Sequence, residues 1–445
     1  MKRRLLVPLL LFGAVLAASV PLASAQTPGP LVDTRHSPTA GTKLAGDLIN
    51  PGNMKFGPDG MIYVAENGNG GSTDFTAPDG SKFTNGTTGR ISKIDPATGI
   101  RTTVVDGLPS NGGDEGATGP ADVAFLNGQL YYIQSHGGAF YGFPNTPTGL
   151  YKVNKDGTTK LVADIGKFNL DQPVAPLVNH TQQDIEVGGN PYALTVRDGM
   201  FLEVDGNQNQ VLQITSSGVM TRIAEFPTHI VSTGIATDST GPLYVGTLGQ
   251  FPFSPDDGRV YQVGYPTGNL TQIASGVSSI TDVEFGPGGQ LYAVSFGAQG
   301  TDPNGSPWMP FSAQIMKVDM ATGTFVPLVT GFSFSTSLLF NGDTAYIIND
   351  AVDAFGSGEI WQIPNFSTIT PLPAAPRPVP TAGPPPPVSA PPATAPVGAI
   401  TAPNTGTGST AGGANETRRW LLLAISAVLG IAILGSGSVL GRKRR

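Results

Sequence analysis

Eight polar residues recur at comparable places in this chain and have side chains that could do chemistry. They are Glu66, Asn67, Asp122, His136, Asp205, Asn207, Asp282 and Asp350. Carboxylate and amide oxygens are the ligands that a hard cation such as Ca²⁺ takes in proteins. Gathered at one place, these residues would form a site for Ca²⁺ or for a small polar ligand. Asp and Asn also cap turns through local hydrogen bonds, and that role explains the same residues without any ligand.

Other kinds of chemistry have little support in the sequence. It contains no phosphate-binding glycine loop with lysine, no zincin helix and no nucleophile elbow. Cysteine is absent, which excludes thiolate metal sites and a cysteine nucleophile. His180 lies near Asp184 and Glu186, but the spacing matches no recognised metal motif. The net charge of −7 and the lack of basic runs in the repeats argue against nucleic-acid binding.

Repeated hairpins are the elements that must position the candidate residues. In residues 280–294, apolar segments flank a Gly/Pro turn, which is the signal for two antiparallel strands. Variants of this phrase occur in residues 53–65, 122–133, 192–204, 234–245 and 337–348. Six copies at a spacing of about 40 to 70 residues predict a repeat architecture.

A second phrase follows each hairpin and predicts a third strand, in which two aliphatic residues stand three apart. The phrases cover residues 91–94, 150–153, 211–214, 260–263, 315–318 and 360–363. Such residues point to opposite faces of a strand, so each sheet should have apolar neighbours on both sides. Fourth strands are predicted at residues 102–105, 159–162, 221–224, 270–274 and 325–329. The pattern predicts an all-β fold, a six-bladed β-propeller over residues 42–366.

The last repeat has no fourth strand of its own, because the repeat pattern stops at Ile363. A spare strand precedes the first repeat instead, since residues 42–47 resemble the fourth strand at residues 159–164. We therefore predict that residues 42–49 form the outer strand of the sixth blade. This pairing would close the ring and cover an otherwise exposed sheet edge.

Long insertions distinguish the predicted blades from one another. They cover residues 66–89, 135–149, 251–257 and 302–308 after second strands, and residues 166–189 after a fourth strand. Loops after second strands leave a propeller on one side, where first strands begin, and binding residues are often carried by such loops. We expect the eight candidates, together with Asn53 and Tyr192 at strand starts, to converge near the axis on this face.

The chain also resembles the ScyD/ScyE family of exported bacterial propellers. The matching phrases run in order from about residue 44 to 366 and include residues 64–71, 107–110, 119–125, 190–192, 204–207, 233–236, 243–246 and 251–253. The sequence departs from the family at Ser232, where proline is usual, and at Thr247, where an acidic residue is usual. The resemblance implies a secreted propeller and supplies no assigned reaction.

Both ends of the chain carry targeting features. Residues 1–25 combine an early basic cluster, an apolar run and Ala23-Ser24-Ala25, which predicts an export signal followed by a leader over residues 26–41. Residues 367–417 are rich in Pro, Ala and Thr and are expected to form a disordered stalk. Residues 418–445 predict a transmembrane helix with a basic cytoplasmic end. A motif that resembles the sortase signal Leu-Pro-x-Thr-Gly consists of Ala402, Pro403, Asn404, Thr405 and Gly406.

The alanine at the first position of this motif leaves two modes of anchoring open. Sortase transfer to the cell wall normally requires leucine there, whereas retention by the helix alone requires no motif. Either mode would place the propeller on the extracellular face of the cell envelope.

Two classes of function remain open from the sequence. An exported, anchored propeller without a catalytic motif favours a binding or scaffolding module for a small polar ligand, a glycan or a protein. The alternative is a divalent-cation-dependent hydrolase or lactonase, in which an axial ion polarises a carbonyl or activates water. That alternative requires Glu66, Asp205 or Asp282 to lie within reach of one another and of an open coordination position.

Overall fold

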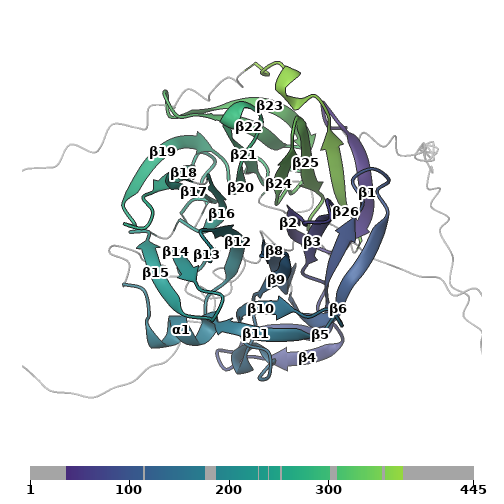
Figure 1. Cartoon of the computed structure of the whole chain (residues 1–445), viewed down its shortest axis with the longest axis vertical. Coiled ribbons are helices and arrows are strands. Elements are labelled where there is room, and N and C mark those ends of the chain that lie inside the picture. Colours follow the sequence, from purple (N-terminus) through teal and green to yellow (C-terminus); the bar gives the residue numbers. More distant parts are fainter. Residues whose placement is uncertain are drawn as a thin grey trace, which may run out of the picture. The chain divides into compact units, whose positions relative to one another are not determined.

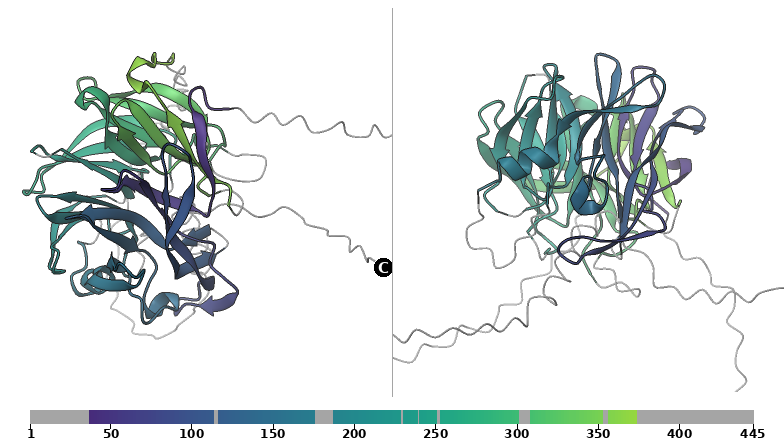
Figure 2. Two further views of the ribbon diagram at one scale, coloured as in Figure 1. Left: turned by 45° about the vertical axis from the view of Figure 1, so that its right-hand side comes forward. Right: turned by 90° about the horizontal axis from the view of Figure 1, so that it is seen from below.

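The computed structural model describes residues 37–113, 116–175, 187–228, 230–238, 240–250, 253–300, 308–352 and 356–373. In this part of the chain the strands form six antiparallel sheets, which surround a common axis and give a propeller-like fold (Figure 1). In the side view of Figure 2 the strands run roughly along this axis. The predicted all-β, six-unit architecture is therefore confirmed.

Several predicted features fall outside the described residues. They are the export signal, the stalk, the sorting-like motif, the transmembrane helix, and the histidines other than His136. Among the described residues, no helix is both long enough and apolar enough to cross a membrane.

The first three sheets in chain order are blades 1 to 3. Blade 1 contains β2 (Pro51–Phe56), β3 (Ile62–Glu66), β4 (Thr73–Thr76), β5 (Lys82–Ile94), β6 (Arg101–Gly113) and β7 (Gly116–Thr118). Blade 2 contains β8 (Pro120–Leu126), β9 (Gln129–Gln134), β10 (Gly149–Val153) and β11 (Thr159–Asp164). Blade 3 contains β12 (Pro191–Arg197), β13 (Met200–Asp205), β14 (Gln210–Ile214) and β15 (Met220–Glu225).

The last three sheets are blades 4 to 6. Blade 4 contains β16 (Ser232–Thr237), β17 (Leu243–Thr247), β18 (Gly258–Val263) and β19 (Leu270–Val277). Blade 5 contains β20 (Ile280–Phe285), β21 (Leu291–Ser295), β22 (Ala313–Asp319) and β23 (Thr324–Phe332). Blade 6 contains β24 (Leu338–Asn341), β25 (Thr344–Asn349), β26 (Gly358–Ile363) and, at its outer edge, β1 (Thr42–Leu48).

The ring is closed by the N-terminal strand, as the sequence predicts. Strand β1 pairs antiparallel with β26, and Lys43 is opposite Trp361. Its side chains Ala45 and Leu48 are buried in the core between blades 6 and 1. Near the axis, the Thr336 hydroxyl of blade 6 donates to the Pro51 and Gly52 carbonyls of blade 1 at 3.2 and 2.8 Å. The two ends of the propeller are therefore joined at both the outer and the inner edge of one sheet.

A repeated backbone contact supports the role of β1 as a fourth strand. In blade 3, Gly218 (φ 88°) packs so tightly on the Val162 carbonyl of β11 that a Cβ atom would overlap it. In blade 1, Gly99 (φ 70°) makes the same contact with the Leu44 carbonyl of β1. Glycine is required at both turns by the positive φ and by the close approach. Strand β1 thus receives the contact that other fourth strands receive from the next blade.

Six hydrophobic clusters lie between neighbouring blades and hold them together. The third strands contribute to the clusters on both of their sides. In blade 1, for example, Ile91 belongs to the cluster shared with blade 2 and Ile94 to the cluster shared with blade 6. Each fully buried aliphatic side chain contributes about 1.5–3 kcal/mol relative to exposure. The prediction of apolar contacts on both faces is confirmed.

Two predicted loops contain secondary structure that the sequence patterns do not reveal. The insertion at residues 66–89 forms β4 and lengthens β5, and β6 continues well beyond the predicted residues 102–105. Glycines in this segment allow backbones to approach closely. The same glycines explain why the composition of the segment predicts a loop. The excursion after blade 2 begins with helix α1 (Ile165–Asp171), whose N-terminus is capped by the Asp164 side chain.

Contacts with blade 5 extend beyond both predicted ends of the propeller. Thr39 donates its backbone N–H to Thr330 and accepts from Thr330 through its hydroxyl. At the other end, the short helix η3 (Phe366–Thr368) buries Phe366, and Leu372 donates to the Pro327 carbonyl. The packed region therefore includes a few residues of the predicted leader and of the predicted stalk.

Candidate functional site

The register of the six innermost strands defines two layers of equivalent positions around the axis. The lower layer consists of the residues that pair with equivalent positions of the second strands, which are Tyr63, Tyr131, Leu202, Tyr244, Tyr292 and Tyr346. In the same order, the lower layer is Lys55, Ala124, Thr195, Ala236, Glu284 and Leu339. The upper layer, two residues earlier on each strand, is Asn53, Asp122, Ala193, Gly234, Asp282 and Ser337. Charged side chains occur in these layers only in blades 1, 2 and 5. We call the space that these strands enclose the axial channel.

Asp122 and Asp282 occupy the same position in blades 2 and 5, and each binds the next blade. Asp122 Oδ1 accepts from the Val123 N–H, and its Oδ2 accepts from the Leu194 N–H of β12, both at 2.7 Å. Asp282 makes the corresponding bonds to the Val283 and Leu338 N–H groups at 2.8 Å. Both side chains are almost fully buried. These carboxylates therefore hold neighbouring innermost strands together while placing negative charge beside the channel.

Lys55 is the positive group of the axial channel. Its Nζ lies 3.8 Å from Asp122 Oδ2, and its side chain is 18% exposed. Burial opposes the charged amine, but Asp122, Asp282 and Glu284 outweigh this effect and raise the pKa of Lys55 above its usual value. Because Asp282 and Glu284 belong to blade 5, this coupling acts across the channel. Lys55 is therefore charged at neutral pH.

The carboxylates hold their protons more tightly than isolated acids do. Burial raises the pKa of Asp122 to about 7 in spite of the opposing charge of Lys55. Burial, with a smaller contribution from Asp282, likewise raises the pKa of Glu284 to about 7. The pKa of Asp282 is raised by burial as well. With three carboxylates and one lysine, the channel carries excess negative charge, and two of its acids titrate near neutral pH.

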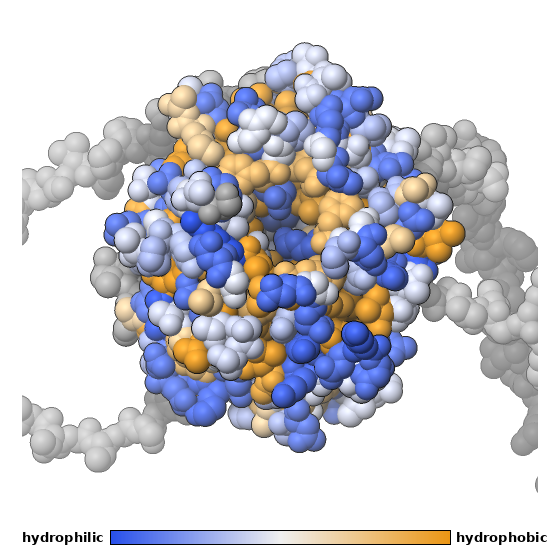
Figure 3. Space-filling view, in the orientation of Figure 1, coloured by the Kyte–Doolittle hydropathy of each residue, from blue (hydrophilic) through white to orange (hydrophobic). Residues whose placement is uncertain are grey.

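Two buried polar atoms near the starts of β2 and β12 have no hydrogen-bond partner in the part of the chain that the structure describes. Asn53 Nδ2 donates to the Tyr192 carbonyl of blade 3 at 2.9 Å, so this contact spans from blade 1 to blade 3 at the strand starts. Asn53 Oδ1 and the Tyr192 hydroxyl are unpaired, although their side chains are only 1% and 5% exposed. Burial, with the charges of Asp282 and Asp122, raises the pKa of Tyr192. A space-filling view shows a hollow at the centre of the ring with hydrophilic surface inside it (Figure 3).

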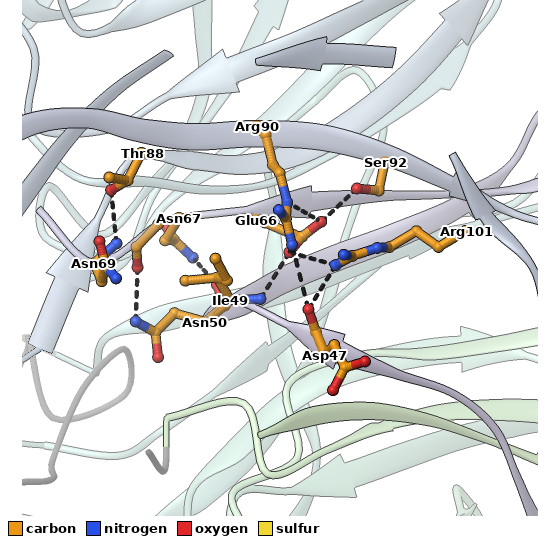
Figure 4. Close-up of polar contacts among 11 residues, drawn as sticks. Asp47, Ile49, Asn50, Glu66, Asn67, Asn69, Thr88, Arg90, Ser92 and Arg101 are labelled. Carbon is orange, nitrogen blue, oxygen red and sulfur yellow. Dashed lines mark hydrogen bonds and ion pairs between the residues drawn. The ribbon is translucent and has the colours of Figure 1, made fainter. Parts of the chain in front are cut away.

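Glu66, the last residue of β3, and Asn67, which follows it, have polar partners in blade 1 and in the chain that leads into it (Figure 4). Glu66 accepts from Arg90 Nε and Nη2 at 2.8 and 2.6 Å and from the Ile49 N–H at 2.7 Å. Asn67 donates to the Asn50 carbonyl and accepts from the Gly119 N–H, both at 3.0 Å. These two side chains therefore connect β3 to the chain entering blade 1 and to blade 2.

The remaining candidates are distributed over separate blades. Asp205 accepts at Oδ1 from the N–H groups of Asn190, Asn207 and Gln208, which makes it the cap of the turn after β13. Asn207 is buried within that same turn. In blade 2, His136 stacks on the Tyr141 ring with 4.3 Å between ring centroids. Asp350 Oδ2 accepts from Asn349 Nδ2 at 3.1 Å at the end of β25 in blade 6. Of the eight candidates, the structure brings Asp122 and Asp282 together at the channel.

Glu203, on β13, is a buried acid that the sequence patterns did not single out. It is 0% exposed, and within the described ranges neither carboxylate oxygen has a hydrogen-bond partner. Burial, followed by the nearby charge of Asp205, raises its pKa well above the usual value. In the register of the second strands, the other blades have apolar or aromatic residues at this position. A protonated carboxylic acid explains how the side chain tolerates this place.

The metal-dependent alternative finds no matching geometry in the described residues. Among them, no three acidic or histidine side chains lie close enough together to hold a metal ion. Glu66 is bound by Arg90, Asp205 by three backbone N–H groups and Asp282 by groups of blade 6. These three carboxylates are therefore used at separate places, and the predicted common coordination site is not formed.

Lys55 and Glu284 are the site residues that sequence reasoning missed. Both stand two residues after a candidate on the same strand, Lys55 after Asn53 and Glu284 after Asp282. The alternation of side chains along a strand places such pairs on one face, so this signal was available in the sequence. The predicted candidates stand at the ends of strands, where loops begin, whereas Lys55 and Glu284 lie inside β2 and β20.

Comparisons with known proteins place no family on this chain. No family model and no curated protein matches it. Among solved structures, it is similar to a PQQ-bound aldose sugar dehydrogenase from Streptomyces coelicolor, with 12% identity and a TM-score of 0.46, over 74% of this chain and 98% of the other. It is also similar to a gluconolactonase from Xanthomonas campestris, with 13% identity and a TM-score of 0.40, over 73% and 98% of the two chains.

Proposed function

We propose that this protein is a propeller displayed on the outer face of the cell envelope, where it binds a small polar ligand in its axial channel. The display rests on the sequence features of residues 1–25 and 367–445, and on the resemblance to the ScyD/ScyE family. Binding rests on one observation, the charged side chains that the innermost strands of blades 1, 2 and 5 place at a common channel, of which Lys55 and Glu284 are partly exposed and Asp122 and Asp282 are buried.

The chemistry of these groups favours recognition over catalysis. Asp122 and Asp282 already accept backbone hydrogen bonds, so they are held in place and are poorly suited to act as nucleophiles. Lys55 and Glu284 are the more accessible groups, and they offer a hydrogen-bond donor and an acceptor of opposite charge. Low dielectric surroundings strengthen the field of such charges and concentrate a complementary ligand.

A ligand screen on the full-length protein in detergent micelles tests this proposal. Charged, zwitterionic and neutral polar compounds are scored by the rise in melting temperature that binding to the native state produces. A hit at the channel should have its affinity changed by Glu284→Gln and by Lys55→Met. The control is Asp171→Asn in α1, which neutralises an acid of an exposed ion pair far from the innermost strands. If every hit responds to the control as strongly as to the channel variants, the proposed site is wrong.

A further inference from the structure

Every titratable side chain on the six innermost strands can be assigned to the channel or away from it. Lys55, Asp122, Tyr192, Asp282 and Glu284 contribute to the channel. Arg197, at the end of β12, is turned to blade 4, where it donates to the Gly241 carbonyl and lies over the Tyr265 ring. Strands β16 and β24 contribute no titratable group. The channel thus has one cation facing three carboxylates, and a positively charged ligand would balance the remaining charge.

The polar groups of the channel that have unused hydrogen-bonding capacity can all accept hydrogen bonds. Asn53 Oδ1 is an acceptor, and the Tyr192 hydroxyl oxygen can accept as well as donate. Glu284 has the Phe285 N–H as its hydrogen-bond donor, at 3.1 Å, which leaves capacity on its carboxylate. Lys55 is already directed to Asp122. A group that only donates satisfies this arrangement better than one that also needs donors.

We infer that the axial channel takes the terminal ammonium group of an alkylamine, with Glu284 as its principal counter-ion. An ammonium group has three donors and no acceptor, which suits the unused accepting capacity of the Asn53 carboxamide, the Tyr192 hydroxyl and the Glu284 carboxylate. The buried Asn53 Oδ1 and Tyr192 hydroxyl, which have no partner among the described residues, are evidence for a ligand that is independent of the acidic groups. This inference rests on the proposed function and specifies the chemical class of its ligand.

The charge of Lys55 determines the direction in which its substitution should change the affinity for an amine. Lys55 is a built-in ammonium group beside the same carboxylates, so it repels a second cation. Lys55→Met should therefore tighten the binding of an amine. A neutral or anionic ligand would instead lose a donor and bind more weakly. The direction of this one change separates ammonium recognition from the other ligand classes.

Isothermal titration of the full-length protein in detergent micelles provides the test. The probe is 1,5-diaminopentane, and the matched control ligand is 1,5-pentanediol, which has the same chain with hydroxyl groups at its ends. We expect the amine to bind and the diol not to bind. Glu284→Gln should weaken the amine by about tenfold or more, because a hydrogen bond to a charged group is lost. Lys55→Met should tighten it, and Asp171→Asn should leave it unchanged.

The pH dependence is a second readout. Protons compete with the amine for the channel carboxylates, so binding should be tighter at pH 8 than at pH 6. Each variant is compared with the parent by its melting curve. The side-chain amide that Glu284→Gln introduces keeps an oxygen that can accept from the Phe285 N–H, so this variant should remain folded.

The possible results distinguish the two proposals. If the diol binds as well as the amine and Glu284→Gln weakens both, the ammonium class is wrong but the channel remains a binding site. If Lys55→Met weakens the amine, ammonium recognition is also overturned. If Ca²⁺ alone binds and Glu284→Gln abolishes it, the ligand is a metal ion instead. If Glu284→Gln and Lys55→Met both leave the affinity for the amine unchanged, this inference fails. The proposed function fails as well if these two variants also leave the affinity for every hit of the ligand screen unchanged.

Discussion

Glu66→Ala tests whether this carboxylate is a structural part of blade 1. The side chain is 0% exposed and forms a two-point ion pair with Arg90, with further hydrogen bonds from Ser92 Oγ at 2.5 Å and the Ile49 N–H at 2.7 Å. Alanine would leave the Arg90 charge without its partner. Removing one member of a buried pair costs about 3–5 kcal/mol. Because the Arg90 side chain keeps 18% exposure, water can solvate it in part, and we expect a loss of about 3 kcal/mol.

The assay is equilibrium unfolding of the full-length protein in urea, followed by tryptophan fluorescence. Glu66→Gln keeps the shape and one acceptor but removes the charge, so it should lose about 2 kcal/mol. Asp171→Ala breaks an exposed ion pair to Lys167 at 2.6 Å and should leave the free energy of unfolding close to that of the parent. The reasoning is refuted if Glu66→Ala stays within about 1 kcal/mol of the parent. It is also refuted if Ca²⁺ stabilises the parent but not Glu66→Ala, since Glu66 would then be a metal ligand.

Three further predictions concern closure, a buried acid and display. Deleting residues 42–49 removes Ala45 and Leu48 from the core between blades 6 and 1 and opens a sheet edge beside β26. The soluble yield and the melting temperature should therefore fall well below those of the parent. An unchanged melting temperature would contradict the closure. Burial raises the pKa of Glu203 above its usual value, so the folded state keeps this proton while the unfolded chain releases it. The contribution of the proton to stability is present in full below the unfolded pKa. It declines as the pH rises towards the folded pKa, by up to about 1.4 kcal/mol per pH unit. Glu203→Gln should remove that decline. The free energy of unfolding of parent and variant is measured at pH 5 and at pH 8. If it changes between the two pH values by the same amount in both proteins, the carboxyl is already ionised in the folded state. Mild protease treatment of intact cells should release the propeller by cleavage in residues 374–417, whereas Thr405→Ala should abolish any wall-linked form and leave helix-anchored protein unaffected; protection of the propeller in intact spheroplasts would contradict the display.

The strand order could be predicted from the sequence because it depends on local patterns. A hairpin joins neighbours in the chain, and the Gly/Pro turn with flanking apolar residues reports it directly. The third strands carry aliphatic residues on both faces, as Ile91 and Ile94 do, because each blade is covered by two others. The long-range pairing of β1 with β26 could also be inferred, because the last repeat lacks a fourth strand and an additional strand precedes the first repeat.

The additional strands of blade 1 could not be predicted in this way. Strand β4 and the N-terminal half of β5 pair through backbone hydrogen bonds, with glycines where backbones approach closely. Such pairing leaves little hydrophobic alternation for a sequence pattern to report. The register between strands decides it, and register is a property of the folded sheet.

The candidate site shows the same division more sharply. Residue types and strand positions alone placed Asp122 and Asp282 at equivalent points of two blades. They also placed Glu66 and Asp205 near strand ends, where nothing in the sequence tells a ligand from a structural partner. That choice is made by Arg90, which reaches Glu66, and by the turn N–H groups, which surround Asp205. The charge balance of the channel depends on Lys55 of blade 1 meeting carboxylates of blades 2 and 5, and electrostatic interactions depend on distances that only the closed ring sets.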